Sequence, residues 1–147
     1  MMYGIGEVSK MFALPVSTLR YYDNEGLFPN LQRNAGVRVF GEQELEQLRV
    51  IECLKRSGLE IKDIKRFMEL CKEGSKTFKD RKEIFEQQKL EVEKEIEKLK
   101  KTHDMLQYKC WYYQTAIADG SEKRINEMLP DRLPDDIQKM YNHAHES

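Results

Sequence analysis

Apolar residues near the start of the chain recur at intervals of three and four, which is the spacing of one face of an α-helix. The set consists of Ile5, Val8, Met11 and Phe12. A break follows at positions 13–15, where Pro15 suits the first turn of a new helix because it lacks an N–H. The second helix should end at Gly26. Two short helices joined by a tight turn predict a helix-turn-helix.

After Gly26 the pattern changes from helical spacing to the alternation of a strand. Leu27-Phe28-Pro29 begins an extended stretch, Asn34-Ala35-Gly36 is a turn cluster, and Val37-Arg38-Val39-Phe40 alternates. These features predict a small hairpin, or wing, beside the second helix. Two further helices, over residues 41–57 and 60–73, should pack on the helix-turn-helix and bury its back.

From Thr77 to about Ala118 the chain has no Pro or Gly and is rich in Lys and Glu, which predicts one long helix. Its seam residues recur every seventh position in two interleaved sets: Phe78, Phe85, Val92, Leu99, Leu106 and Tyr113, and then Ile96, His103, Cys110 and Ile117. This heptad pattern indicates that the helix pairs with a partner helix. We therefore expect a homodimer with two-fold symmetry.

The second helix carries side chains suited to DNA. Arg20 can offer a bidentate fork to a guanine edge or a phosphate, although a surface ion pair is the alternative. Ser17 and Thr18 can donate hydroxyl hydrogen bonds to phosphate, next to a helix N-terminus that favours an anion. Arg38, on the wing, is suited to grip a phosphate to one side.

Tyr21 and Tyr22 each combine an apolar ring with a hydroxyl. One of them can anchor the helix in the core while the other reaches the DNA backbone, and the alternative is a pair of core aromatics. These residues complete a predicted DNA-binding set of Ser17, Thr18, Arg20, Tyr21, Tyr22, Arg38, Lys55 and Lys10.

The overall charge gives no support to nucleic-acid binding. The 147 residues have a net charge of −1, with 39% hydrophobic and 35% charged residues. DNA binding therefore requires the basic residues to be localised. We expect one face to gather Lys10, Arg20, Arg33, Arg38, Lys55 and Arg56.

The location of the protein follows from two features of the composition. The chain has no long apolar run, so we expect no membrane partner. Its three cysteines have no close pair, which fits a reducing compartment. Both features predict a cytoplasmic protein.

The order IGEVSK, then STLRYYDNEGL, then a hairpin ending in GVRVF resembles the MerR family of transcription regulators. The resemblance is close over about the first half of the chain and architectural for the long helix. It implies a mostly α fold, in which a winged helix-turn-helix DNA-binding domain precedes a long antiparallel coiled-coil dimerisation helix. We place the DNA-binding domain at residues 1–74, the dimerisation helix at 75–119, and a short C-terminal tail or effector region at 120–147.

The resemblance also implies a function. A two-fold dimer should bind sequence-specifically to an inverted repeat. In the family that repeat lies in double-stranded promoter DNA, which the regulator distorts for RNA polymerase. Lys55 matches a position that resembles a phosphate-binding lysine of the family, with a solvated lysine as the alternative.

The resemblance leaves three kinds of effector open: a metal, an electrophile that reacts with a thiol, and an organic molecule. Metal-responsive members place cysteines at both ends of the long helix, but residues 74–78 and 118–121 contain neither Cys nor His, so we expect no metal and no cofactor. The placement of Cys53 resembles the thiol-based, aldehyde- or electrophile-responsive branch, and Lys55 and Arg56 would favour its thiolate. The alternative for Cys53 is a small apolar residue packed inside the third helix.

Aromatic residues near the end of the long helix offer a site for an organic effector. Trp111 and Tyr112 could line a small pocket, or they could instead pack the tail onto the helix. The tail is too short for the large effector domain of the drug-sensing members. We find no catalytic constellation and predict no enzyme; the alternative function is a coiled-coil structural or adaptor protein without direct DNA readout.

Overall fold

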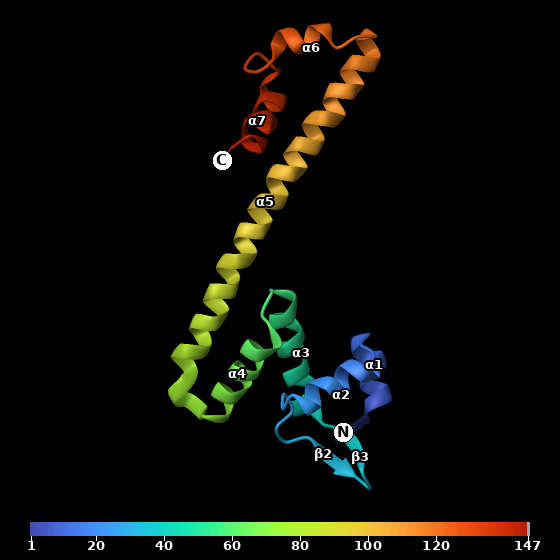
Figure 1. Ribbon diagram of the computed structural model, residues 1–147, viewed down its shortest axis with the longest axis vertical. Helices are drawn as coiled ribbons and strands as arrows, with labels where there is room; N and C mark the ends of the chain where they lie inside the picture. Colours follow the sequence, from blue (N-terminus) through green and yellow to red (C-terminus); the bar gives the residue numbers. More distant parts are fainter. Residues whose placement is uncertain (147) are drawn as a thin grey trace. The chain divides into compact units, whose positions relative to one another are not determined.

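The predicted helix-turn-helix is present in the computed structural model, which describes residues 1–146 (Figure 1). Helix α1 spans Ile5–Phe12 and helix α2 spans Val16–Asn24. Between them, Ala13 takes a left-handed conformation with φ 53°, which ends α1. The hydroxyl of Ser9 donates a hydrogen bond to the carbonyl of Leu14 across the turn. This local bond satisfies the backbone where the two helices meet.

The predicted wing is also present. Strands β1 (Tyr3–Gly4), β2 (Gln32–Asn34) and β3 (Val37–Phe40) form an antiparallel sheet in the order β1-β3-β2. Asn34 pairs with Val37, so the β2–β3 loop consists of Ala35 and Gly36, which both have positive φ. Positive φ at both loop positions is the conformation of a type I′ turn, whose twist matches the strands.

Two further helices bury the back of the helix-turn-helix. Helix α3 spans Glu42–Arg56 and helix α4 spans Ile61–Lys72, followed by the short 3₁₀ helix η1 at Gly74–Thr77. Their apolar faces meet α1, α2 and the sheet in one core, composed of Val8, Leu19, Tyr22, Leu27, Phe28, Phe40, Leu45, Leu48, Ile51, Leu54, Ile64, Phe67 and Met68. This core belongs to the first of two compact units, residues 1–91.

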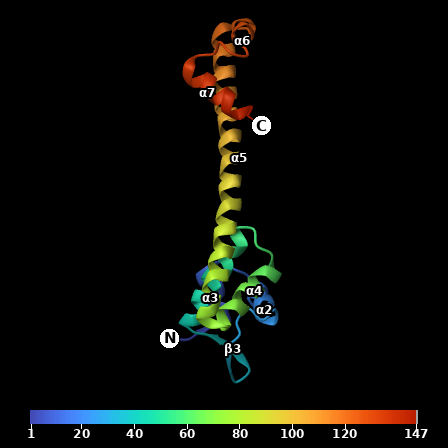
Figure 2. The same cartoon turned by 90° about the vertical axis from the view of Figure 1, so that its left-hand side faces the viewer.

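The long helix α5 runs over Phe78–Asp119, close to the predicted range. Its second half belongs to the other compact unit, which starts at residue 92 and contains α6 (Lys123–Met128) and α7 (Asp135–Ala144). Helix α7 lies along α5 in both views (Figures 1 and 2). A small core of Tyr108, Tyr112, Ile125 and Leu133 joins these helices.

One histidine fastens α7 to α5. His143 of α7 bonds to Glu97 at 2.7 Å through Nε2, and its Nδ1 contacts Asp104. Hydrogen bonding to Asp104, and then to Glu97, raises the pKa of His143. The bond to His143 in turn lowers the pKa of Glu97.

Among the described residues, no helix has the length and apolar character needed to cross a membrane.

The contacts of His143 with Glu97 and Asp104 predict that the stability of the second unit depends on pH. The pKa of His143 is raised in the folded chain. Its contribution to folding stability is therefore complete at a pH below the ordinary histidine pKa and is lost as the pH rises through the raised pKa. We expect the docking of α7 to be less stable at a pH of about 8.5 than at about 6. Thermal melting followed by fluorescence of Trp111, which packs in the small core, measures the difference.

The matched control is His145, whose ring bonds to the Tyr141 carbonyl within the tail and lies outside the seam. His143→Ala should abolish most of the pH dependence, whereas His145→Ala should leave it largely unchanged. An equal pH dependence in His143→Ala and the parent chain would contradict the role of His143 in holding α7 on α5.

Candidate nucleic-acid interface

Helix α2 presents two different faces. Leu19 and Tyr22 are buried in the core, whereas Ser17, Arg20 and Tyr21 are exposed. Pro15 is the N-cap and makes no side-chain capping bond, so the first backbone N–H groups of α2 are open to an external acceptor. An exposed helix N-terminus flanked by hydroxyl and guanidinium groups can bind phosphate.

Arg20 and Lys10 are the exposed cations of the helix-turn-helix. Arg20 lies on α2 and Lys10 on α1. Within residues 1–146, neither side chain has an ion pair or hydrogen bond. The surface ion pair considered for Arg20 is therefore not formed in the described part of the chain, and its guanidinium keeps all its donors for a ligand.

The wing is tied to α2 by an acidic residue that the sequence reasoning missed. Arg38 Nε donates a 2.7 Å hydrogen bond to Oδ2 of Asp23, and both side chains are largely buried. Arg33 approaches the same carboxylate oxygen at 3.5 Å. Arg38 thus positions the wing, and a phosphate contact through its other N–H groups stays a prediction.

A second tie joins α2 to α3. The buried Tyr22 donates its hydroxyl hydrogen to Glu52 Oε1 at 3.0 Å, and Lys55 Nζ donates to the Tyr22 oxygen at 2.9 Å. Burial raises the pKa of Tyr22, and this effect outweighs the hydrogen bond from Lys55, which lowers it. The same hydrogen bond raises the pKa of Lys55, which therefore stays charged.

Tyr21 and Tyr22 lie on different faces of α2, so they are not a pair of core aromatics. Tyr22 is an anchor in the core, whereas Tyr21 is 46% exposed on the outer face of α2. Thr18 is half-buried beside the exposed Ser17. The sequence did not predict the role of Glu52, because its hydrogen-bond partner Tyr22 lies 30 positions away and no local pattern links the two.

The candidate effector residues lie in different surroundings. Cys53 is exposed on α3, so it does not pack inside the helix bundle, and its role in sensing electrophiles stays a prediction. Trp111 is half-buried and Tyr112 is buried, and both pack in the small core with the tail, as the second interpretation held. In the described part of the chain, no group of three His, Cys, Asp or Glu side chains could hold a metal ion.

Comparisons with known proteins agree with this geometry. A model of the MerR HTH family regulatory protein matches residues 3–71, and a model described as MerR, DNA binding matches residues 45–108. An uncharacterised HTH-type transcriptional regulator of Haemophilus influenzae is 40% identical over 127 residues, which cover 86% of this chain and 94% of the relative. The regulator AdhR of Bacillus subtilis is 36% identical over 81 residues, covering 54% and 58% of the two chains.

Solved structures give the same result. One is HiNmlR, described as a MerR family regulator lacking the sensor domain and bound to promoter DNA; it is 40% identical, with a TM-score of 0.72 over 84% of this chain and 99% of the other. A MerR family regulator of Bacillus thuringiensis is 42% identical, with a TM-score of 0.68 over 75% and 97%. These similar proteins are regulators rather than enzymes.

The tie between α2 and α3 can be tested by removing one oxygen. Tyr22→Phe leaves Lys55 and Glu52 without their shared partner, so we expect the free energy of unfolding to fall by about 1–3 kcal/mol. Tyr21→Phe is the matched control and should change it by less than about 0.5 kcal/mol. Urea denaturation measures both, and equal effects would show that the buried hydroxyl is not a fastening point.

Proposed function

This chain belongs to the MerR family of transcription regulators, and we propose from this premise that two copies bind one inverted repeat in promoter DNA. The exposed face of α2 carries the proposal, since it presents Ser17, Arg20 and Tyr21 beside an uncapped helix N-terminus. HiNmlR, which shares the fold over most of both chains, is bound to promoter DNA. In this proposal α2 enters a major groove and the wing lies beside it.

Each candidate residue then has a defined part. Arg20 reads a base edge or grips a phosphate, and Ser17, Thr18 and Tyr21 donate to the sugar-phosphate backbone. Lys10 and Lys55 add positive charge near the phosphates. Tyr22 and Arg38 act chiefly by positioning, because their polar groups are engaged with Glu52, Lys55 and Asp23.

Dimerisation through α5 is supported by the division of its two faces in the second unit. The tail covers one face, where Tyr108 and Tyr112 are buried. The heptad seam lies elsewhere on the helix and remains bare: Leu99 is 66% exposed, Leu106 59% and Ile117 81%. A row of large apolar side chains at heptad spacing is the surface that a partner helix covers. We propose that this partner is a second copy running antiparallel.

The seam fixes the distance between two α2 helices, and that distance selects the spacing of the half-sites. As in the family, we propose that the dimer bends or untwists the promoter so that RNA polymerase can use it. Such a deformation costs on the order of 1–6 kcal/mol, which a two-headed interface can supply. We propose that the protein acts in the cytoplasm, where promoter DNA and RNA polymerase would be its partners.

The DNA contact is tested by Arg20→Ala. We expect the affinity for the promoter of the chain's own gene to fall by about tenfold or more, because losing a base contact costs about 1–3 kcal/mol. Arg132→Ala removes the same charge from an exposed position in the tail and should have little effect. Fluorescence anisotropy at several salt concentrations measures both variants. Unchanged promoter affinity in Arg20→Ala would contradict the contact by Arg20, and absence of salt-dependent binding by the parent chain would favour the adaptor alternative.

The dimer contact is tested by Leu106→Lys. Placing a charge in the seam should raise the dimer dissociation constant by at least tenfold, or about 1.4 kcal/mol. Ala118→Lys adds the same side chain at an exposed position outside both seam sets and is the control. Analytical ultracentrifugation measures the constants. A monomeric parent chain at micromolar concentration would contradict the proposed dimer.

A further inference from the structure

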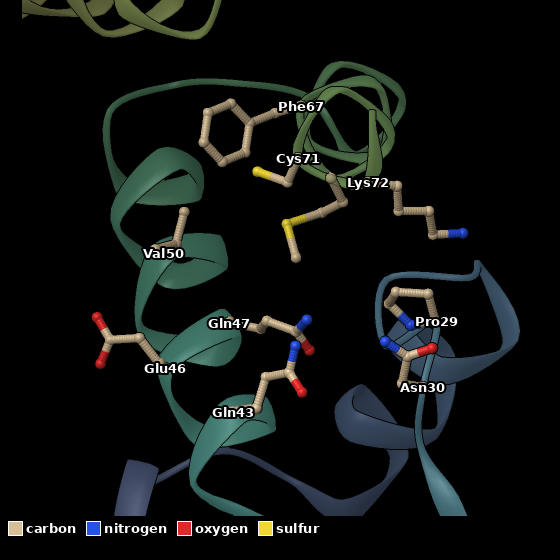
Figure 3. Close-up of a pocket in the computed structure, with 10 residues that line it drawn as sticks. Pro29, Asn30, Gln43, Glu46, Gln47, Val50, Phe67, Cys71 and Lys72 are labelled. Atoms are coloured by element: carbon tan, nitrogen blue, oxygen red, sulfur yellow. The ribbon is translucent and has the colours of Figure 1, made fainter. Parts of the chain in front are cut away.

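The DNA-binding unit contains a cavity that the proposed function does not use. It has a volume of about 280 Å³ and lies between α3, α4 and the segment at Pro29 and Asn30 (Figure 3). Since one water takes about 30 Å³ in the liquid, this volume holds about nine groups of that size. The cavity is therefore large enough for a small organic molecule.

A residue that lines the cavity has a buried polar atom without a partner. Oε1 of Gln47 is buried and has no hydrogen bond within the described residues. Gln43 and Gln47 both extend from α3 toward the side where Asn30 lies (Figure 3). An acceptor removed from water without a donor costs free energy. A ligand that brings an O–H or N–H into the cavity would remove that cost once the Gln47 amide rotates to present Oε1 to it.

The rest of the lining defines the remainder of the ligand. Val50, Phe67, Met68 and Cys71 form an apolar wall from α3 and α4. Lys72 extends from α4 above Pro29 and Asn30 (Figure 3), and it has no ion pair within residues 1–146. The acidic side chain of the lining, Glu46, is already paired with Arg49 at 2.8 Å. The uncompensated charge at the cavity is therefore positive.

We propose that this cavity binds a small organic acid with a flat or compact apolar body and a hydroxyl or amide donor. The donor meets Gln47 Oε1, the body packs on the apolar wall, and the carboxylate pairs with Lys72. Pockets of this kind combine apolar walls with a few polar groups that fix the orientation of the ligand.

The position of the cavity gives the ligand a route to the DNA-binding surface; this step rests on the proposed function. Pro29 and Asn30 lead directly into the wing strand β2, and α3 carries Glu52 and Lys55, which hold Tyr22 of α2. A ligand that fits one arrangement of these elements better than another shifts their equilibrium. Ligand and DNA must then change each other's affinity by the same factor.

The binding step is tested without DNA. The probe is 4-hydroxybenzoate, titrated into the full chain labelled with ¹⁵N, with backbone amide shifts as the readout. We expect saturable shifts at Gln43, Gln47 and Lys72. Benzoate, which lacks the donor, should bind at least tenfold more weakly.

Two variants assign the contacts. Gln47→Met keeps the length of the side chain but removes the acceptor, and Lys72→Gln removes the charge at an exposed position; each should weaken binding of the probe at least tenfold. Lys79→Gln, on an exposed lysine of α5 outside the cavity, is the control and should bind normally. No saturable shift, or equal affinities for the probe, benzoate and all three variants, would overturn the site.

A separate measurement tests the link to DNA. The promoter affinity of the parent chain should change at least threefold at saturating 4-hydroxybenzoate, and that of Gln47→Met should not. Bound probe with an unchanged promoter affinity would overturn the regulatory coupling. Absence of DNA binding in every condition would count against the proposed function, whereas the amide shifts report on the cavity independently.

Discussion

The hydroxyl group of Tyr22 helps to fix where helix α2 lies against helix α3. A buried phenol needs a polar partner, and this one has two: it donates to Glu52 and accepts from Lys55. Both partners come from α3, so the polar contact acts together with the buried side chains of Leu19 and Tyr22 to hold the rotation of α2 about its own axis. Rotation decides which residues of a recognition helix point outward. The exposure of Arg20 and Tyr21 thus follows from the burial of Leu19 and Tyr22 on the other face of α2.

The same reasoning explains how a chain with a net charge of −1 can bind DNA. Part of its acidic content is structural within the DNA-binding unit. Asp23 holds Arg38 and the wing, and Glu52 holds Tyr22. These carboxylates are covered or paired, which leaves exposed cations such as Lys10 and Arg20 to face a ligand. Local placement of charge, rather than its sum, governs the potential at such a surface.

Local periodicity was sufficient to predict the helices, the hairpin and the heptad helix, because each depends on residues a few positions apart. The ties between elements were not predictable in this way. Arg38 and Asp23 are separated by 15 positions and Lys55 and Tyr22 by 33, so their pairing emerges only when the core closes. Cys53 shows the same limit: the helix that carries it was predicted, but its position on the exposed face of that helix was not. The cavity beside Gln47 likewise requires three separate segments.

The tail of the chain has a physical role that follows from the two faces of α5. Without α6 and α7, the aromatic face with Tyr108 and Tyr112 would be as bare as the seam, and a helix that is apolar on several sides pairs in more than one register. Covering one face with the tail leaves a single apolar stripe, and His143 fastens that cover through Glu97 and Asp104. In the proposed dimer the spacing of the two α2 helices depends on this register, so covering one face of α5 would narrow the set of half-site spacings that the dimer can bind.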